Sequence, residues 1–137
     1  MAAKCVAVLA FLLLAPAGPT AAEHEVYYRF TVLGYVKDAA GQPRAGLRLE
    51  LTRERTGFSY LGETDRAGFY VITARLGDES VGERLRLRAG DQMAVVTARF
   101  DPADRRQERG TRVDFLGAGA RELAAAFPAT LARFLAR

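Results

Sequence analysis

The chain has 137 residues, of which 50% are hydrophobic and 26% are charged, and its net charge is +4. This length suits one domain with its own core, and the composition excludes a chain that stays unfolded. A single histidine and a single cysteine exclude most zinc sites and most histidine- or cysteine-based catalysis.

Residues 1–22 have the three parts of a secretory signal. Lys4 supplies a positive charge, residues 5–14 form an unbroken apolar run, and small residues lead up to Ala22. The apolar run is about half as long as the roughly twenty residues that a membrane-spanning helix needs. We therefore expect cleavage after Ala22 and a periplasmic or secreted protein, in preference to a retained membrane anchor. Cleavage would also remove Cys5, the only thiol.

The residues that follow alternate between apolar and polar, with the period of two that is typical of half-buried strands. Such segments occur at 26–37, 47–52, 58–64, 69–75, 84–88, 93–100 and 112–115. Turn signals separate several of them, as in the Asp-to-Gly spacing of residues 38–41 and 65–68. The pattern predicts an all-β domain over residues 23–117, a seven-stranded antiparallel, immunoglobulin-like β-sandwich.

The period changes after residue 117. Leu123, Phe127, Leu131 and Phe134 recur at steps of three and four, which places them on one stripe of a helix. Residues 118–137 are therefore predicted to form an amphipathic helix, kinked or split near Pro128. The helix is expected to cover a face or an edge of a sheet, and contact with a partner protein or a membrane surface remains the alternative.

Two motifs resemble the carboxypeptidase regulatory-like domain. Residues 34–46 match the pattern Gly-x-Val-x-Asp-x-x-Gly-x-Pro-x-x-Gly of that family, and residues 64–70 resemble its second hallmark, Thr-Asp-x-x-Gly-x-Tyr. The resemblance implies a transthyretin-like, or prealbumin-like, sandwich. It also implies a domain that accompanies another protein and performs no chemistry itself, since the motifs consist of turn and core residues.

The inventory of reactive side chains argues against an enzyme. His24 is the only histidine and stands beside the expected cleavage site, so the domain has no imidazole for a catalytic triad. Ser59 lies in Gly-Phe-Ser-Tyr-Leu, which lacks the second glycine of a nucleophile elbow. Hydroxyisourate hydrolases share the transthyretin-like fold but depend on histidines and a C-terminal Tyr-Arg-Gly-Ser that this chain lacks. We therefore expect no catalytic residue, no cofactor and no metal site.

One candidate binding surface is a row of arginines. Arg84, Arg86 and Arg88 are expected to project from one face of their strand, about 7 Å apart. In the simplest interpretation this is a solvated face whose charge is balanced by Glu50 or Glu63. The alternative is binding of a phosphorylated glycolipid or an acidic polysaccharide.

A second candidate surface lies on the first strand. Tyr27, Leu33 and Tyr35 are expected to point outward, either beneath the C-terminal helix or exposed for contact with a sugar or a protein.

These features together predict an exported, non-catalytic accessory module that binds another envelope or extracellular protein. The alternatives are a sandwich that binds carbohydrate or anionic lipid directly and, third, a transthyretin-like hydrolase. An exported chain is not expected to bind nucleic acid.

Overall fold

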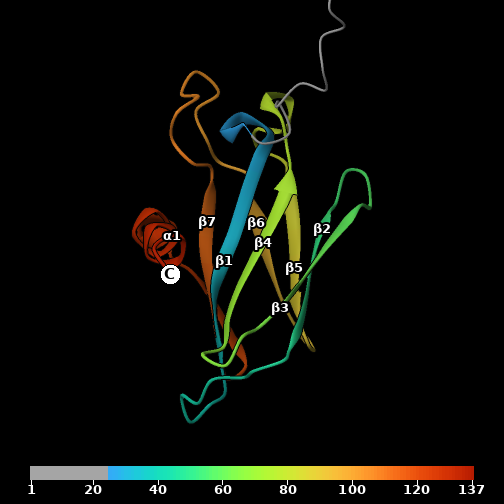
Figure 1. Ribbon diagram of the computed structural model, residues 1–137. Helices are drawn as coiled ribbons and strands as arrows, with labels where there is room; N and C mark the ends of the chain where they lie inside the picture. Colours follow the sequence, from blue (N-terminus) through green and yellow to red (C-terminus); the bar gives the residue numbers. More distant parts are fainter. Residues whose placement is uncertain (1–24) are drawn as a thin grey trace, which may run out of the picture.

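The computed structural model describes residues 25–137, which form two four-stranded sheets packed face to face, with one helix on the outside (Figure 1). The strand order is β4-β1-β7-β8 in the first sheet and β3-β2-β5-β6 in the second. The prediction of an all-β sandwich is confirmed. The predicted signal segment 1–22 and His24 lie outside the described residues.

The elements follow the predicted segments closely in the first half of the chain. The first sheet comprises β1 (Arg29–Lys37), β4 (Phe69–Arg75), β7 (Gly110–Leu116) and β8 (Gly119–Glu122). The second comprises β2 (Arg48–Arg53), β3 (Ser59–Glu63), β5 (Arg84–Ala89) and β6 (Gln92–Thr97). The 3-10 turns η2 (Val26–Tyr28), η3 (Asp78–Ser80) and η4 (Ala124–Ala126) and the helix α1 (Phe127–Leu135) complete the described chain.

The prediction of seven antiparallel strands differs from the structure in two respects. An eighth strand, β8, pairs with β7 as a hairpin at residues that were predicted to begin the helix, so the sheet continues beyond residue 117. Strands β1 and β7 run parallel, with Val36 opposite Phe115. Apolar alternation carries no information about strand direction, which explains the second difference. The four residues of β8 are all exposed and show no such alternation, which explains the first.

The main core lies between the two sheets and follows the alternation of the strands. On β5, Leu85 and Leu87 are fully buried while the arginines between them are exposed. Leu49 and Leu51 of β2 and Phe30 of β1 complete the same cluster from both sheets. Burial of each such side chain contributes about 2 kcal/mol to the stability of the fold.

Strand β1 leaves no room for a side chain at Gly34. Tyr70 on β4 donates its hydroxyl to the carbonyl of Val113 on β7 over 2.6 Å, and β1 lies between these two strands. A Cβ atom at Gly34 would overlap that carbonyl oxygen and lie 2.7 Å from its carbon. Burial, and then the charge of Asp114, raises the pKa of Tyr70 well above its ordinary value, so the hydroxyl stays protonated and donates.

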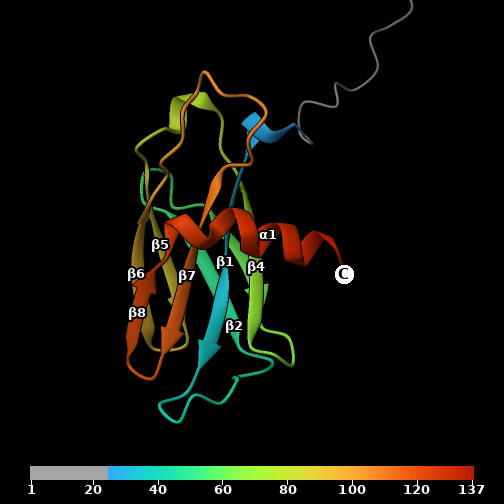
Figure 2. The same ribbon diagram turned by 90° about the vertical axis from the view of Figure 1, so that its left-hand side faces the viewer.

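Helix α1 crosses the outer face of the first sheet (Figure 2). Between the helix and the sheet lies a second apolar cluster, separate from the main core. It consists of Leu33 and Phe69 from the strands and Phe127 and Leu131 from the helix. The predicted helix over 118–137 is corrected to Phe127–Leu135. Pro128 does not split the helix, because it lies in the first turn, where a proline needs no N–H donor.

A buried ion pair joins the end of β2 to the residue that precedes β5, and these are the two central strands of the second sheet. The guanidinium of Arg53 donates two hydrogen bonds of 2.9 Å to the carboxylate of Glu83. Burial alone raises the pKa of Glu83, but the hydrogen bonds from Arg53 and Ser80 outweigh this effect and lower the pKa overall. Glu83 is therefore ionised and bonded in the folded protein.

We expect Glu83→Gln to lower the free energy of unfolding by about 2 kcal/mol at neutral pH, because it removes two charge-assisted hydrogen bonds. A carboxyl whose pKa is lower in the folded than in the unfolded state stabilises the protein above about pH 4.3. That stabilisation is lost as the pH falls through the folded-state pKa. Urea unfolding midpoints of the wild type and the variant should therefore begin to converge below about pH 5 and continue to do so as the pH falls.

The exposed Glu63 supplies a matched control for this prediction. Glu63→Gln should leave the midpoint unchanged across the same pH series. A difference between Glu83→Gln and the wild type that stays constant down to acid pH would contradict the assignment of the stabilisation to the ionised carboxylate.

Candidate interaction surface

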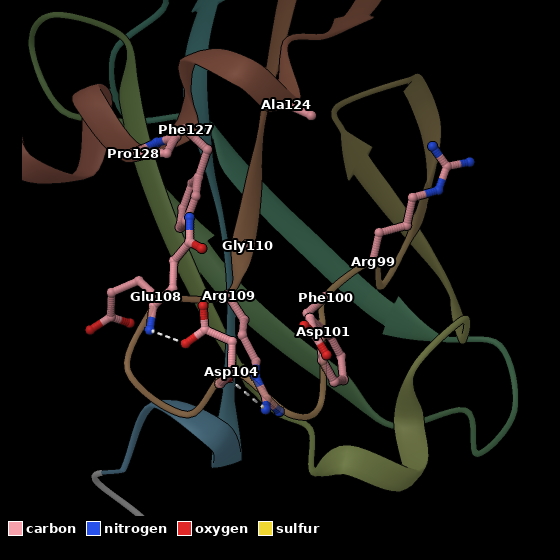
Figure 3. A pocket seen from close by; sticks show the side chains of 11 residues that line it. Arg99, Phe100, Asp101, Asp104, Glu108, Arg109, Gly110, Ala124, Phe127 and Pro128 are labelled. Carbon is pink, nitrogen blue, oxygen red and sulfur yellow. Dashed lines mark hydrogen bonds between the residues drawn. The ribbon is translucent and has the colours of Figure 1, made fainter.

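A pocket of about 220 Å³ lies at one end of the sandwich, between the loop that precedes β7 and the start of α1 (Figure 3). The carboxylate of Asp104 accepts the backbone N–H groups of Arg106 and Gln107 over 3.0 and 3.1 Å. These backbone hydrogen bonds, that of Gln107 foremost, lower the pKa of Asp104. The carboxylate therefore holds the loop in shape and is not set up as a general acid.

Arg109 ties the elements of this end together. Its buried guanidinium donates to the carboxylate of Asp78 over 2.8 Å and to the carbonyl of Tyr27 over 3.2 Å, and it stacks over the ring of Phe100. Asp78 also pairs with Arg105, whose guanidinium lies 4.5 Å from the centre of the Tyr27 ring. Tyr27 thus lies in η2 and packs within this structural cluster, so the structure does not place it on the outer face of β1.

Within residues 25–137 there is no cluster of three or more histidine, cysteine, aspartate or glutamate side chains that could hold a metal ion. Ser59 donates its hydroxyl to Glu50 over 2.7 Å, on an open sheet face and without a histidine between them. No helix in the same part of the chain is long and apolar enough to span a bilayer.

The outer face of the second sheet is an open surface that three of the predicted residues occupy. Figure 1 shows α1 against the first sheet, and among the described residues no helix covers the second. Arg84, Arg86 and Arg88 project from β5 into solvent, as predicted. Register places Val95 of β6 opposite Arg86 and Met93 opposite Arg88.

Large apolar side chains flank the arginines on both sides. Leu61 of β3 is 64% exposed, and Met93 and Val95 of β6 are 53% and 45% exposed. Leu61, Glu50, Arg88 and Met93 form one continuous row across the four strands. We call this surface the arginine face and define it by Leu61, Arg84, Arg86, Arg88, Met93 and Val95.

Carboxylates balance part of the charge on the arginine face. Arg84 forms an ion pair of 3.2 Å with Glu54, and Glu50 stands opposite Arg88 in the register of β2 and β5. Arg86 stands opposite a threonine and forms no ion pair within residues 25–137.

Glu50 and Glu63, which were expected to balance the charge of the arginines, lie at different distances from the arginine row. Glu50 lies in the row of Arg88, and its carboxylate also accepts the hydroxyl of Ser59. Glu63 stands opposite Arg48 instead, beyond the end of the arginine row. A shallow hollow of about 240 Å³ remains between Glu50, Ser59, Arg86 and Arg88.

Tyr35 lies on the opposite sheet, beneath α1. Its ring contacts Phe69 at a centroid distance of 5.0 Å, and the guanidinium of Arg112 lies 5.2 Å from its centre. Leu33 is fully buried in the same cluster, so the prediction that the helix covers this face is confirmed for Leu33, whereas Tyr35 is half-buried and remains partly open. The predicted binding residues therefore occupy three separate places: the end cluster, the helix-covered face and the open face.

Sequence reasoning missed the apolar half of the arginine face. Met93 and Val95 alternate with Ala94 and Val96, so their period of two was readable, but both alternating sets are apolar. Nothing in such a segment indicates which set faces the solvent. Leu61 was missed for a similar reason, because the glycine next to it gives no contrast in polarity.

No protein-family model matches the chain, and no curated protein matches it. Among solved structures the chain is similar to the dioxygenase domain of a dioxygenase carbohydrate-binding protein fusion from Streptomyces sp. SirexAA-E. The identity is 18%, the match covers 65% of this chain and 79% of that one, and the TM-score is 0.45. A similarity at this level assigns no activity to the present chain, and the resemblance to the carboxypeptidase regulatory-like domain stays a prediction.

Proposed function

We propose that the protein is exported and acts as a non-catalytic interaction module, whose arginine face binds another envelope or extracellular protein. The observation that carries the proposal is the composition of that face. Exposed arginines stand directly beside Met93 and Val95 on an uncovered sheet, and Leu61 lies in the same row on the far side of Glu50. Arginine and methionine are enriched at protein interfaces, and contiguous exposed apolar side chains are uncommon on monomers.

The geometry of the arginine face suits a partner that buries both kinds of side chain. Successive arginines on β5 point to the same side, and the apolar residues of β3 and β6 border them. A protein partner would cover the apolar flanks and pair the unbalanced charge of Arg86. Desolvated arginines that are surrounded by apolar contacts are typical of the residues that dominate binding energy.

A second candidate is direct binding of an acidic polysaccharide or an anionic lipid. The regular spacing of Arg84, Arg86 and Arg88 favours it, since such a row can follow a linear array of negative charges. The carboxylates of Glu54 and Glu50 weaken the positive field of the row. For this reason the protein partner is the stronger proposal.

Site-specific photo-crosslinking in the native host tests the proposal. A benzophenone amino acid at Val95 reports on the arginine face, and the same residue at the exposed Thr73 reports on the outer face of the first sheet. We expect one adduct of discrete mass from position 95 and none from position 73. Equal yields at both positions, or no adduct at position 95, would refute the proposal.

Two pairs of substitutions separate the two candidates. The pair Arg86→Gln and Arg88→Gln should lower the yield of the adduct at least fivefold, and the pair Leu61→Ser and Met93→Ser should do the same for a protein partner. Binding of a polyanion would be weakened by the arginine substitutions alone. It would also be lost in about 0.5 M salt, because interactions between charges then extend over only a few ångströms.

A further inference from the structure

A separate depression lies on the other sheet, between β8, the end of β1 and α1. We call it the basic groove and define it by six of its lining residues: Tyr35, Lys37, Arg112, Leu116, Arg121 and Arg133. Figure 2 shows α1 crossing the first sheet part of the way along its strands, so that β1, β7 and β8 extend beyond the helix. The volume of the groove is about 620 Å³, within the range of small-molecule sites.

The charge of the basic groove is positive and largely uncompensated. Lys37, Arg121 and Arg133 form no ion pair within residues 25–137. Asp114 is the one carboxylate that lines the groove, and Arg112 holds it through two hydrogen bonds of 3.0 and 2.8 Å. Asp114 also stands opposite Arg121 in the register of β7 and β8, so one carboxylate faces four cations in the lining and the groove keeps a net positive charge.

The wall behind these cations is held rigidly by the fold. The carboxylate of Asp114 also accepts the backbone N–H of Tyr35 over 3.1 Å. Tyr35 itself has no partner residue on β7 in the register of the two strands. Arg112 donates a further hydrogen bond of 3.1 Å to Thr130 of α1. Arg112 and Asp114 thus hold helix and sheet together, which leaves the other cations available for a ligand.

The groove also contains apolar surface. Leu116 is 58% exposed, and Leu123 and the ring of Tyr35 are half-buried beside it. A concave site with one sign of charge concentrates ions of the opposite sign. Apolar walls add affinity for a ligand in proportion to the apolar area that they bury.

We propose that the basic groove binds a small amphipathic anion, with a phosphate or carboxylate head and an aliphatic or aromatic body. Lys37, Arg121 and Arg133 face the head, and Leu116 and the Tyr35 ring contact the body. These cations come from β1, β8 and α1, so the site exists only in the folded chain. The site is independent of the arginine face, which belongs to the other sheet.

Titration of the protein with decyl phosphate below its micelle concentration, followed by amide NMR, tests this proposal. We expect saturation at one equivalent and shifts at Gly119, Ala120 and Leu123, with Val95 unshifted. Inorganic phosphate, which offers the head alone, should bind at least tenfold more weakly, because the apolar body contributes about 0.8 kcal/mol for each buried methylene. Equal affinity for the two anions would overturn the proposal.

Variants test the assignment of the groove. Arg121→Gln and Arg133→Gln should each weaken binding of decyl phosphate about fivefold, as expected for partly exposed charge pairs. Gly119→Trp keeps the charge but adds a ring beside Leu116, its partner in the register of β7 and β8, and it should weaken binding by a similar factor. The exposed Arg66, in the turn before β4, provides a matched control, and Arg66→Gln should bind as the wild type does.

Vesicles that contain phosphatidic acid distinguish a free ligand from a lipid head group. Saturable binding of monomeric decyl phosphate supports the proposal whether or not vesicles also bind. Binding to vesicles alone would overturn it, as would wild-type affinity in both arginine variants. Circular dichroism of each variant should match the wild type, because the side chains of Arg121 and Arg133 are exposed and form no hydrogen bond or ion pair within residues 25–137.

Discussion

Replacement of Gly34 by alanine is expected to lower the free energy of unfolding by about 4 kcal/mol, or to prevent folding. The added methyl group would overlap the carbonyl oxygen of Val113 and approach Asp114 Oδ1 to 2.9 Å. Both obstacles belong to β7, the parallel neighbour of β1, so the two central strands would have to separate. The same displacement would break the hydrogen bond from Tyr70 to Val113.

Two variants serve as comparisons for Gly34→Ala. Gly119→Ala places a methyl group in β8 of the same sheet, where its nearest neighbour is a carbonyl oxygen at 3.6 Å, and it should leave stability unchanged. Tyr70→Phe removes only the hydroxyl and should cost about 2 kcal/mol. Because Gly34→Ala and Tyr70→Phe act on the same carbonyl, the double variant should lose less than the sum.

Urea unfolding followed by circular dichroism measures all of these changes. A loss below about 1 kcal/mol for Gly34→Ala would show that β1 and β7 adapt to a side chain at this position. Close packing between β1 and β7 would then not be the reason for a glycine at position 34.

Replacement of Phe127 by alanine is expected to cost about 3 kcal/mol and to release α1 from the sheet. The ring of Phe127 is 97% buried, and its Cζ atom would lie 2.5 Å from a Cβ atom at Gly110, so it packs directly on the backbone of β7. Without it the helix retains Leu131 and Phe134 as contacts, which is a small apolar area for nine residues. Leu33, which the helix covers completely, would become accessible.

The same helix offers a matched control for Phe127→Ala. Leu135 is 67% exposed, and Leu135→Ala should leave the unfolding midpoint unchanged. Because α1 forms one wall of the basic groove, Phe127→Ala should also abolish binding of decyl phosphate, while the adduct from position 95 persists. Retention of wild-type stability together with full ligand binding would show that the helix does not depend on this contact.

The turns were predictable from the sequence because a short segment contains everything that they need. Asp38 and Asp65 each accept two backbone N–H groups of their own turn over 2.9 Å, and Gly41 and Gly68 each donate to the backbone carbonyl of that aspartate. Both glycines have a positive φ, a conformation that favours glycine. The two motifs behind the resemblance to the carboxypeptidase regulatory-like domain thus encode the same kind of turn.

The candidate surfaces were predictable only in part. The alternation of arginine and leucine on β5 contrasts strongly in polarity, so the outward direction of Arg84, Arg86 and Arg88 followed from the sequence. Their neighbours Met93 and Leu61 depend on which strands lie beside β5 and β2 and in which register. Tyr27 was misplaced because its contact with Arg105 spans 78 positions along the chain.

The sequence by itself therefore determined the class of fold, the main strands and the turns between them, because backbone geometry imposes these periods on neighbouring residues. Only the tertiary structure decided the parallel pairing of β1 with β7, the extra strand β8 and the meeting of Lys37 with Arg121 and Arg133 in one groove. Those features depend on pairing energies distributed over many residues that lie far apart in the chain. No local pattern in the sequence encodes such energies.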